Sequence, residues 1–124
     1  MKIKFFEKAK LASIKSTHQF KVGATLVLGK NVYSGWNNVS KTHSKTGNPY
    51  GACHAEFTVI RKALTRHSDL SGAELYVYRT RRMGGQGLSK PCKFCFEFIK
   101  RMGIKRVFYS GDTGYFQYNR QELM

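Results

Sequence analysis

The chain carries Cys53-His54-Ala55-Glu56 and, further along, Pro91-Cys92-Lys93-Phe94-Cys95. Together these segments supply one imidazole, from His54, and two thiolates, from Cys92 and Cys95. Nitrogen and sulfur donors of this kind suit zinc. Three protein ligands leave one tetrahedral position open for water, which is typical of a catalytic rather than a structural zinc site. We therefore predict that the chain binds Zn²⁺ through these three side chains.

The spacing of the motif residues agrees with this interpretation. Cys92 and Cys95 lie three residues apart, so they share one face of a helix. Pro91 suits the first turn of that helix, where its missing N–H costs nothing, and the positive helix end favours ionised thiolates. Glu56 follows His54 by two residues, which would place it beside the zinc-bound water without binding the metal. We predict that Glu56 is the catalytic proton shuttle.

Both segments resemble the zinc signature of the cytidine and deoxycytidylate deaminase superfamily, His-x-Glu followed by Pro-Cys-x-x-Cys. Residues 92–111, CKFCFEFIKRMGIKRVFYSG, also resemble the deoxycytidylate-type helix and the strand after it. Gly35-Trp36-Asn37 resembles the Gly-x-Asn that members carry after their second strand. The signature is specific for the superfamily and says little about the substrate.

The resemblance implies a three-layer α/β/α fold with a mixed five-strand sheet. It also implies zinc-dependent hydrolytic deamination of a cytosine nucleotide or nucleoside, with deoxycytidine monophosphate (dCMP) to deoxyuridine monophosphate (dUMP) as the best single reaction. Zinc-activated water would attack C4 of the base while Glu56 moves the protons, and ammonia would leave. Asn37 would contact the sugar or base, and backbone N–H groups near Ala55 and Cys92 would hold the pyrimidine carbonyl.

Other substrate contacts are suggested by residue type alone. His43, in a loop over residues 37–52, would bond the sugar or phosphate, or would only tie down the loop. Tyr109 or Tyr115 would stack on the substrate, or would be an ordinary sheet aromatic. The loop over residues 80–90 is either a mobile basic lid or a solvated surface loop. The cations that would bind a 5′-phosphate are Arg79, Arg81, Arg82, Lys41 and Lys45.

The zinc residues also allow other interpretations. Cys53 together with His54, Cys92 and Cys95 would make a closed structural zinc site, although adjacent ligands converge poorly on one ion. The Cys-x-x-Cys pair alone would suit a redox site, and His54 alone would suit a core histidine. The joint occurrence with Glu56 favours the catalytic site over each of these.

The charge balance is the second strong feature of the 124 residues. Twenty-two Lys and Arg face seven Asp and Glu, for a net charge of +15. Such an excess attracts phosphates, so the partner is expected to be a nucleotide, RNA or single-stranded DNA. General affinity for polyanions without specificity is the alternative.

Composition places the chain among globular proteins, with 41% hydrophobic and 14% aromatic residues. We expect a single domain over residues 1–124, because this length suits one hydrophobic core. No apolar run reaches membrane-spanning length, and the start of the chain lacks a secretory signal. Three cysteines with a Cys-x-x-Cys pair fit a reducing cytoplasm. Small deaminases of this kind usually associate, so we also expect a homo-oligomer.

Hydrophobic periodicity predicts helices over residues 3–17, 54–67 and 91–102. It predicts strands over residues 20–28, 32–36, 74–79 and 104–109, with Gly23 marking a bulge or a close approach. The strand–helix–strand order from 74 to 109 implies a right-handed crossover and a parallel pair. Residues 115–119 then predict a strand that returns antiparallel. This last step departs from the deoxycytidylate and tRNA-editing branches, where a helix intervenes and the fifth strand runs parallel.

Three functions therefore remain. The leading hypothesis is an enzyme that deaminates a free cytosine nucleotide. The second is a cytosine or adenine deaminase acting on RNA or single-stranded DNA, which the charge favours. The third is a non-catalytic nucleic-acid-binding protein with a structural zinc, against which Glu56 argues.

Overall fold

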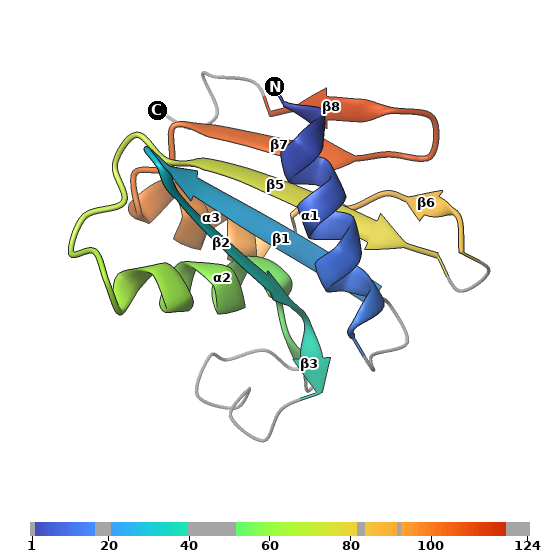
Figure 1. The fold of residues 1–124 in the computed structure, drawn as a ribbon, viewed down its shortest axis with the longest axis horizontal. Helices are drawn as coiled ribbons and strands as arrows, with labels where there is room; N and C mark the ends of the chain where they lie inside the picture. Colours follow the sequence, from blue (N-terminus) through green and yellow to red (C-terminus); the bar gives the residue numbers. More distant parts are fainter. Residues whose placement is uncertain (1, 17–20, 40–51, 82–83, 92, 119–124) are drawn as a thin grey trace.

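The structure of the protein, a computed structural model, describes residues 2–16, 21–39, 52–81, 84–91 and 93–118 (Figure 1). Its elements follow the order α1 (Ile3–Ile14), β1 (Lys21–Leu28), β2 (Asn31–Trp36), β3 (Asn38–Val39), β4 (Ala52–Cys53), α2 (Ala55–Leu64), β5 (Glu74–Thr80), β6 (Gln86–Gly87), α3 (Lys93–Arg101), β7 (Arg106–Ser110) and β8 (Tyr115–Gln117). Within these ranges no helix is long and apolar enough to span a membrane.

The main sheet has the strand order β2-β1-β5-β7-β8. β1 pairs antiparallel with both β2 and β5, while β5 and β7 run parallel. β8 pairs antiparallel with β7, with Tyr109 opposite Phe116. The predicted mixed sheet, the parallel crossover pair and the antiparallel last strand are therefore confirmed.

The predicted count of five strands was one too low, because β6 also pairs with β5 and the sheet has six strands. The extra strand follows from a tight reversal after β5. The Arg81 N–H donates to the Gly85 carbonyl at 2.6 Å, and the Gly84 N–H donates back to the Arg81 carbonyl at 2.8 Å. This reversal places Gln86 beside Thr80 and Gly87 beside Arg79.

Helices cover both faces of the sheet, which confirms the three layers. α1 crosses one face and α2 and α3 lie against the other (Figure 1). Side chains alternate across β5 accordingly: Leu75 and Val77 join the core under α2 and α3, whereas Tyr76 and Tyr78 join Phe5 and Phe6 of α1. A strand buried on both faces explains why β5 is apolar along most of its length.

The three helices are shorter than the sequence periodicity predicts. α1 ends at Ile14 rather than at residue 17, and α2 ends at Leu64 rather than at residue 67. The extra residues form turns, in which the Arg66 and His67 N–H groups still donate to the Ala63 carbonyl. α3 ends before Gly103, as predicted, and this glycine has a φ of +74° that favours glycine.

Gly23 of β1 is a close-approach position, as one of the two sequence interpretations holds. A Cβ built there would overlap the backbone of α1 at Ala9 and Ser13. Glycine therefore lets α1 pack directly on the sheet at this point.

We predict that Gly23→Ala destabilises the protein by about 1–3 kcal/mol, because α1 must move to admit the methyl group. The measurement is the free energy of unfolding in urea. Gly114→Ala is the matched control, since no heavy atom lies within 4 Å of the added Cβ there. Equal unfolding midpoints for the two variants would show that the close packing of α1 is not needed.

Candidate zinc centre

A short two-stranded ladder positions the start of α2. β3 and β4 pair antiparallel, with Asn38 opposite Cys53 and Val39 opposite Ala52. His54 follows β4 directly as the N-terminal cap residue of α2, with extended backbone angles. Its carbonyl accepts hydrogen bonds from the backbone N–H and the hydroxyl of Thr58, both at 3.0 Å. The imidazole therefore stands at the positive end of α2.

Glu56 lies in the first turn of α2, where a carboxylate favours the positive helix end. Its side chain is buried, with 5% of its surface exposed. A buried carboxylate requires compensating charge or hydrogen bonds, because transfer from water costs free energy. This burial agrees with a position beside a bound cation.

Cys95 comes from the first turn of α3 and is almost fully buried. α3 packs beside α2 through stacked rings of Phe57 and Phe98, with centroids 4.6 Å apart. Because β5 and β7 are parallel, α3 must begin near the carboxyl end of β5, and the cluster of His54, Glu56 and Cys95 shows that α2 begins at this end too. The N-termini of α2 and α3 therefore meet near the Cys95 thiol.

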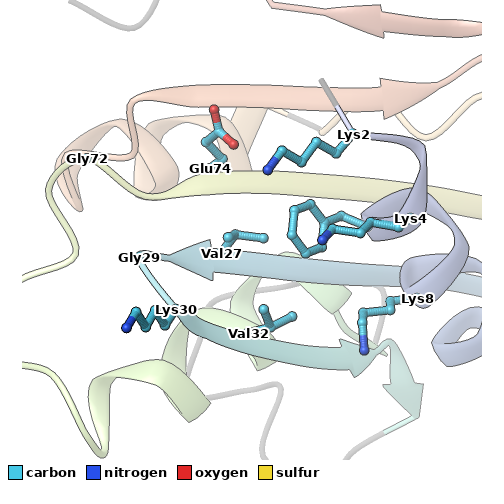
Figure 2. A pocket seen from close by; sticks show the side chains of 10 residues that line it. Lys2, Lys4, Lys8, Val27, Gly29, Lys30, Val32, Gly72 and Glu74 are labelled. Carbon is cyan, nitrogen blue, oxygen red and sulfur yellow. The ribbon is translucent and has the colours of Figure 1, made fainter.

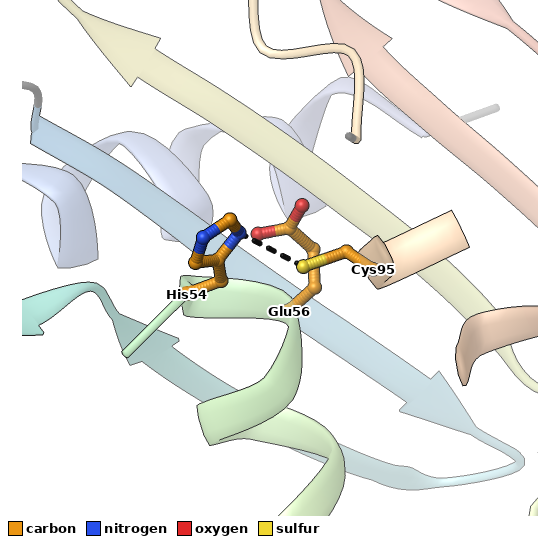
Figure 3. A group of neighbouring side chains, drawn as sticks. All are labelled: His54, Glu56 and Cys95. Atoms are coloured by element: carbon orange, nitrogen blue, oxygen red, sulfur yellow. Dashed lines mark hydrogen bonds between the residues drawn. The ribbon is translucent and has the colours of Figure 1, made fainter. Parts of the chain in front are cut away.

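His54, Glu56 and Cys95 point toward one another (Figure 3). Their nitrogen, oxygen and sulfur ligand atoms all lie within 4.8 Å of one another. The Cys95 sulfur and the His54 Nδ1 form a hydrogen bond of 2.9 Å. The structure thus brings together three side chains that the sequence analysis singled out. Cys92, the third predicted ligand, lies outside the described residues.

The chemistry of this donor set fits zinc. Zinc binds imidazole nitrogen and thiolate sulfur at about 2.0–2.3 Å, so ligand atoms around one tetrahedral ion lie about 3.5 Å apart. The spread of 4.8 Å or less is compatible with one ion. The mixture of nitrogen, sulfur and carboxylate donors excludes the all-oxygen cages that calcium and magnesium prefer.

Residues 1–111 match the protein family described as the cytidine and deoxycytidylate deaminase zinc-binding region. The chain belongs to this deaminase family. It is therefore a zinc-dependent deaminase, a hydrolase, and its cofactor is zinc. A comparison with curated protein sequences found no significant match.

Solved structures of deaminases are similar to this one. A dCMP deaminase from the cyanophage S-TIM5 in apo form has 27% identity and a TM-score of 0.66, covering 88% of this chain and 84% of its own. A cytidine deaminase from Burkholderia pseudomallei has 21% identity and a TM-score of 0.71, covering 100% and 96%. A tRNA:A34 deaminase structure has 26% identity and a TM-score of 0.58, covering 86% and 74%. These similarities confirm the predicted fold.

Asn37 of the deaminase joins β2 to β3, the strand that pairs with the segment just before His54. The β3–β4 register pairs Asn38 with Cys53, so one further step places Asn37 opposite His54. The Asn37 side-chain oxygen accepts from the Val22 N–H at 2.9 Å, and its carbonyl accepts from the Ser16 hydroxyl at 2.8 Å. These bonds fix Asn37 to the start of β1 and the end of α1, and its contact with the substrate stays a prediction.

The loop after β5 contacts the β7–β8 turn in its described part, and the choice between a basic lid and a surface loop stays open. Arg81 forms an ion pair with Asp112. The Gln86 side-chain nitrogen donates to the Gly111 and Gly114 carbonyls, at 2.8 and 3.0 Å. These contacts hold the loop against the β7–β8 turn.

The other predicted substrate contacts have different surroundings. Alternation along β5 places Arg79 on the face that carries α2 and α3. Tyr109 lies on that face too and contacts the rings of Phe116 and Tyr118, at 5.8 and 5.4 Å between centroids. Tyr115 stacks on Phe6 of α1, which is the opposite face, so it is a sheet aromatic. The residues outside the described ranges are His43, Lys41, Lys45 and Arg82.

Sequence reasoning missed the residues that hold the start of α3. The Ser89 hydroxyl donates to the Val77 carbonyl at 2.8 Å and lies 2.9 Å from the Ser110 hydroxyl. The Ser110 hydroxyl donates to the Gly87 carbonyl at 2.7 Å. These serines are buried and carry no motif. The available signal was their position at the ends of strands that flank the Cys-x-x-Cys segment.

We predict that Cys95→Ala purifies without stoichiometric zinc, because two protein ligands remain where three are needed. Metal content by inductively coupled plasma mass spectrometry is the measurement. Cys53→Ala is the matched control and should retain one zinc per chain. Zinc retention by Cys95→Ala would contradict the ligand assignment, and zinc loss in Cys53→Ala would favour the closed structural site.

Proposed function

We propose that this deaminase converts dCMP to dUMP at a zinc ion held by His54, Cys92 and Cys95. The observation that carries the proposal is the convergence of His54, Glu56 and Cys95 at the first turns of α2 and α3. An imidazole, a thiol and a buried carboxylate in one cluster give a metal site with a proton carrier beside it. That combination suits hydrolysis of an amidine carbon better than redox or purely structural roles.

His54, Cys92 and Cys95 would hold a zinc ion, which would supply a water-derived nucleophile near neutral pH by lowering the pKa of bound water. Glu56 accepts one proton from the attacking water and delivers it to N3 of the cytosine ring. It then carries the second proton to the departing amine, which leaves C4 as ammonia while C4 becomes the carbonyl of uracil. Burial of Glu56 keeps bulk water from competing for these protons.

The backbone and side chains around the cluster would orient the pyrimidine. Ala55 is the first residue of α2, and the first N–H groups of a helix have no acceptor within the helix. Its N–H is thus suited to hold the pyrimidine carbonyl. Asn37 would orient the sugar or base, Arg79 would bind the 5′-phosphate, and His43 and Tyr109 stay predicted contacts.

The choice of dCMP rests on two supports. The cyanophage S-TIM5 dCMP deaminase, with 27% identity over 88% of this chain, has been solved in complex with dCMP and dUMP. The net charge of +15 also favours a phosphorylated substrate over a neutral nucleoside. Formation of a homo-oligomer stays a prediction beside this proposal.

A second candidate is deamination of cytosine or adenine within RNA or single-stranded DNA. The charge favours it as well, and a structure from work on A-to-I editing by tRNA:A34 deaminases has 26% identity to this chain. The two candidates share the zinc chemistry and differ in the substrate that reaches it.

We expect kcat/KM for dCMP to exceed that for deoxycytidine by about 10- to 100-fold, since a charge-assisted phosphate contact contributes roughly 1.5–3 kcal/mol. The assay follows ammonia release with dCMP, deoxycytidine and oligonucleotides that contain cytosine or adenine. A higher kcat/KM for an oligonucleotide than for dCMP would support the second candidate. Equal kcat/KM values for deoxycytidine and dCMP would show that no phosphate contact contributes.

The variant Glu56→Gln tests whether this activity depends on the proposed site. It should keep its zinc and lose at least about 100-fold in kcat, the usual contribution of general acid–base catalysis. Glu97→Gln, at an exposed position of α3, is the matched control and should retain activity. Zinc loss in Glu56→Gln would make Glu56 a ligand, and near-normal turnover would remove its role as proton shuttle.

A further inference from the structure

A hollow of about 590 Å³ lies between the start of α1 and the β1–β2 turn. Its floor is apolar, formed by Phe5, Val27 and Val32. Phe5 and Val27 belong to the core under α1, so the hollow opens on the sheet face opposite the zinc centre. It is therefore separate from the substrate site. We call it the lysine hollow, after the residues at its rim: Lys2, Lys4, Lys8 and Lys30.

The rim of the lysine hollow carries a strong positive charge. In Figure 2, Lys2 and the two lysines of α1 lie on one side, and Lys30 stands on the β1–β2 turn at the other. The single carboxylate in the lining, Glu74, already accepts a hydrogen bond from Arg106 at 2.9 Å. Four ammonium groups around one engaged carboxylate leave a net attraction for anions.

The cations continue along α1 toward the edge strand β2. The Lys15 ammonium lies 5.4 Å from the centre of the Trp36 ring, at the end of β2 and next to Asn37. The helix rises about 1.5 Å per residue, so Lys4 and Lys15 lie about 16 Å apart along the axis. A row of charges of this length suits a chain of phosphates better than one phosphate group.

We propose that the lysine hollow and the outer side of α1 bind the backbone of single-stranded nucleic acid. The hollow is open and its cations are exposed lysines, which act as point charges rather than as the bidentate forks of arginine. Such a surface binds backbone phosphates without reading sequence. The partner is a macromolecule, separate from the nucleotide that is deaminated.

The test measures binding rather than turnover, by fluorescence anisotropy of a labelled oligothymidylate of about 12 nucleotides. This strand has no cytosine, so it is not a substrate. Each phosphate contact with a single strand contributes about 0.7 to the slope of log K against log salt. The triple variant Lys4→Gln/Lys8→Gln/Lys30→Gln should lower that slope by about 2 and weaken binding by roughly 10- to 100-fold at 0.1 M salt.

The matched control removes the same charge from α2 and α3, with Lys62→Gln, Lys100→Gln and Arg101→Gln. This variant should bind the oligonucleotide almost as tightly as the unmodified protein, and both variants should keep their deaminase activity. Equal loss of binding in the two variants would overturn the proposal, because net charge alone would then explain the affinity. Equally tight binding of inorganic tripolyphosphate would overturn it too, because a small anion would then suffice.

A separate observation concerns Tyr118, which follows β8. Its buried hydroxyl donates a hydrogen bond of 2.9 Å to the Pro91 carbonyl. Its ring stacks on Phe96 of α3, with centroids 4.6 Å apart, and the Lys90 ammonium lies 5.1 Å from the ring centre. Its own N–H donates to the Val107 carbonyl at 3.0 Å, which fixes Tyr118 to β7.

These contacts enclose the segment that contains the two motif cysteines. Lys90 and Pro91 lie just before Cys92, and Phe96 lies just after Cys95. We infer that Tyr118 is a positioning residue for the zinc centre, on the proposed assignment of Cys92 and Cys95 as ligands. It holds the first turn of α3 so that the Cys95 sulfur faces His54. Mutation of a group that orients a metal ligand in this way typically lowers the metal affinity by 10- to 100-fold.

Tyr118→Phe removes the hydroxyl and keeps the stacked ring. We expect zinc affinity to fall about tenfold, measured by competition with a chromogenic chelator. The visible spectrum of the Co²⁺-substituted protein should also change, because the ligand geometry changes. The thermal midpoint of the metal-free protein should fall slightly, because the buried Pro91 carbonyl loses its donor. The Co²⁺ spectrum is therefore the readout that separates positioning from this loss of stability.

Tyr33→Phe is the matched control, because its hydroxyl lies 2.7 Å from the His67 Nε2, at the end of α2 away from the zinc centre. This variant should bind zinc as the unmodified protein does. Unchanged zinc affinity and an unchanged Co²⁺ spectrum in Tyr118→Phe would overturn the inference. If the unmodified protein bound no zinc, the ligand assignment itself would fail, which is a different result.

Discussion

The contact between the His54 imidazole and the Cys95 thiol joins two helix starts that are 41 residues apart in sequence. Neither residue can bind a metal alone, so the activity depends on holding this contact. β5 does so, because it carries the chain back to the end of the sheet where α2 begins, and α3 starts there before crossing to the parallel strand β7. The fold therefore fixes the distance between the N-termini of α2 and α3.

The same end of the sheet concentrates electrostatic effects that favour anions. Two helix N-termini meet there, and the site removes Glu56 and Cys95 from water. In such surroundings an ionised thiol and carboxylate are stable only with a cation beside them. The affinity for zinc and the proposed role of Glu56 as a proton carrier thus depend on one arrangement of backbone dipoles and buried groups.

The sequence allowed prediction of the features that depend on local pattern. Two spaced motifs identified His54 and Glu56, and the apolar and aromatic residues from 74 to 79 predicted a strand, which the structure confirms as β5. Features that depend on distant contacts could not be predicted. The β3–β4 ladder has two residues on each side, too few for a periodicity signal. Tyr118 was included in a strand, because nothing in the sequence indicates that its hydroxyl reaches the Pro91 carbonyl.

The helix ends and the number of strands were also beyond what the side-chain pattern could predict. The predicted helix ran past Leu64 although Thr65 and Arg66 are exposed, because no glycine or proline follows in the sequence before Gly72 to mark its end. β6 depends on a reversal at Arg81 that is fixed by backbone hydrogen bonds rather than by side-chain pattern. In each case a contact made by the backbone decided a boundary that side-chain hydrophobicity could not.

The β3–β4 ladder also has a consequence for variation among proteins of this architecture. It holds residues 39 and 52 side by side, so the segment between them leaves and re-enters the fold at one point. The entropic cost of closing such a segment grows only slowly with its length. Natural or engineered exchange of residues 40–51 is therefore expected to leave β4 and the start of α2 in place. The ladder thus separates variation in this segment from the geometry of the residues that begin α2.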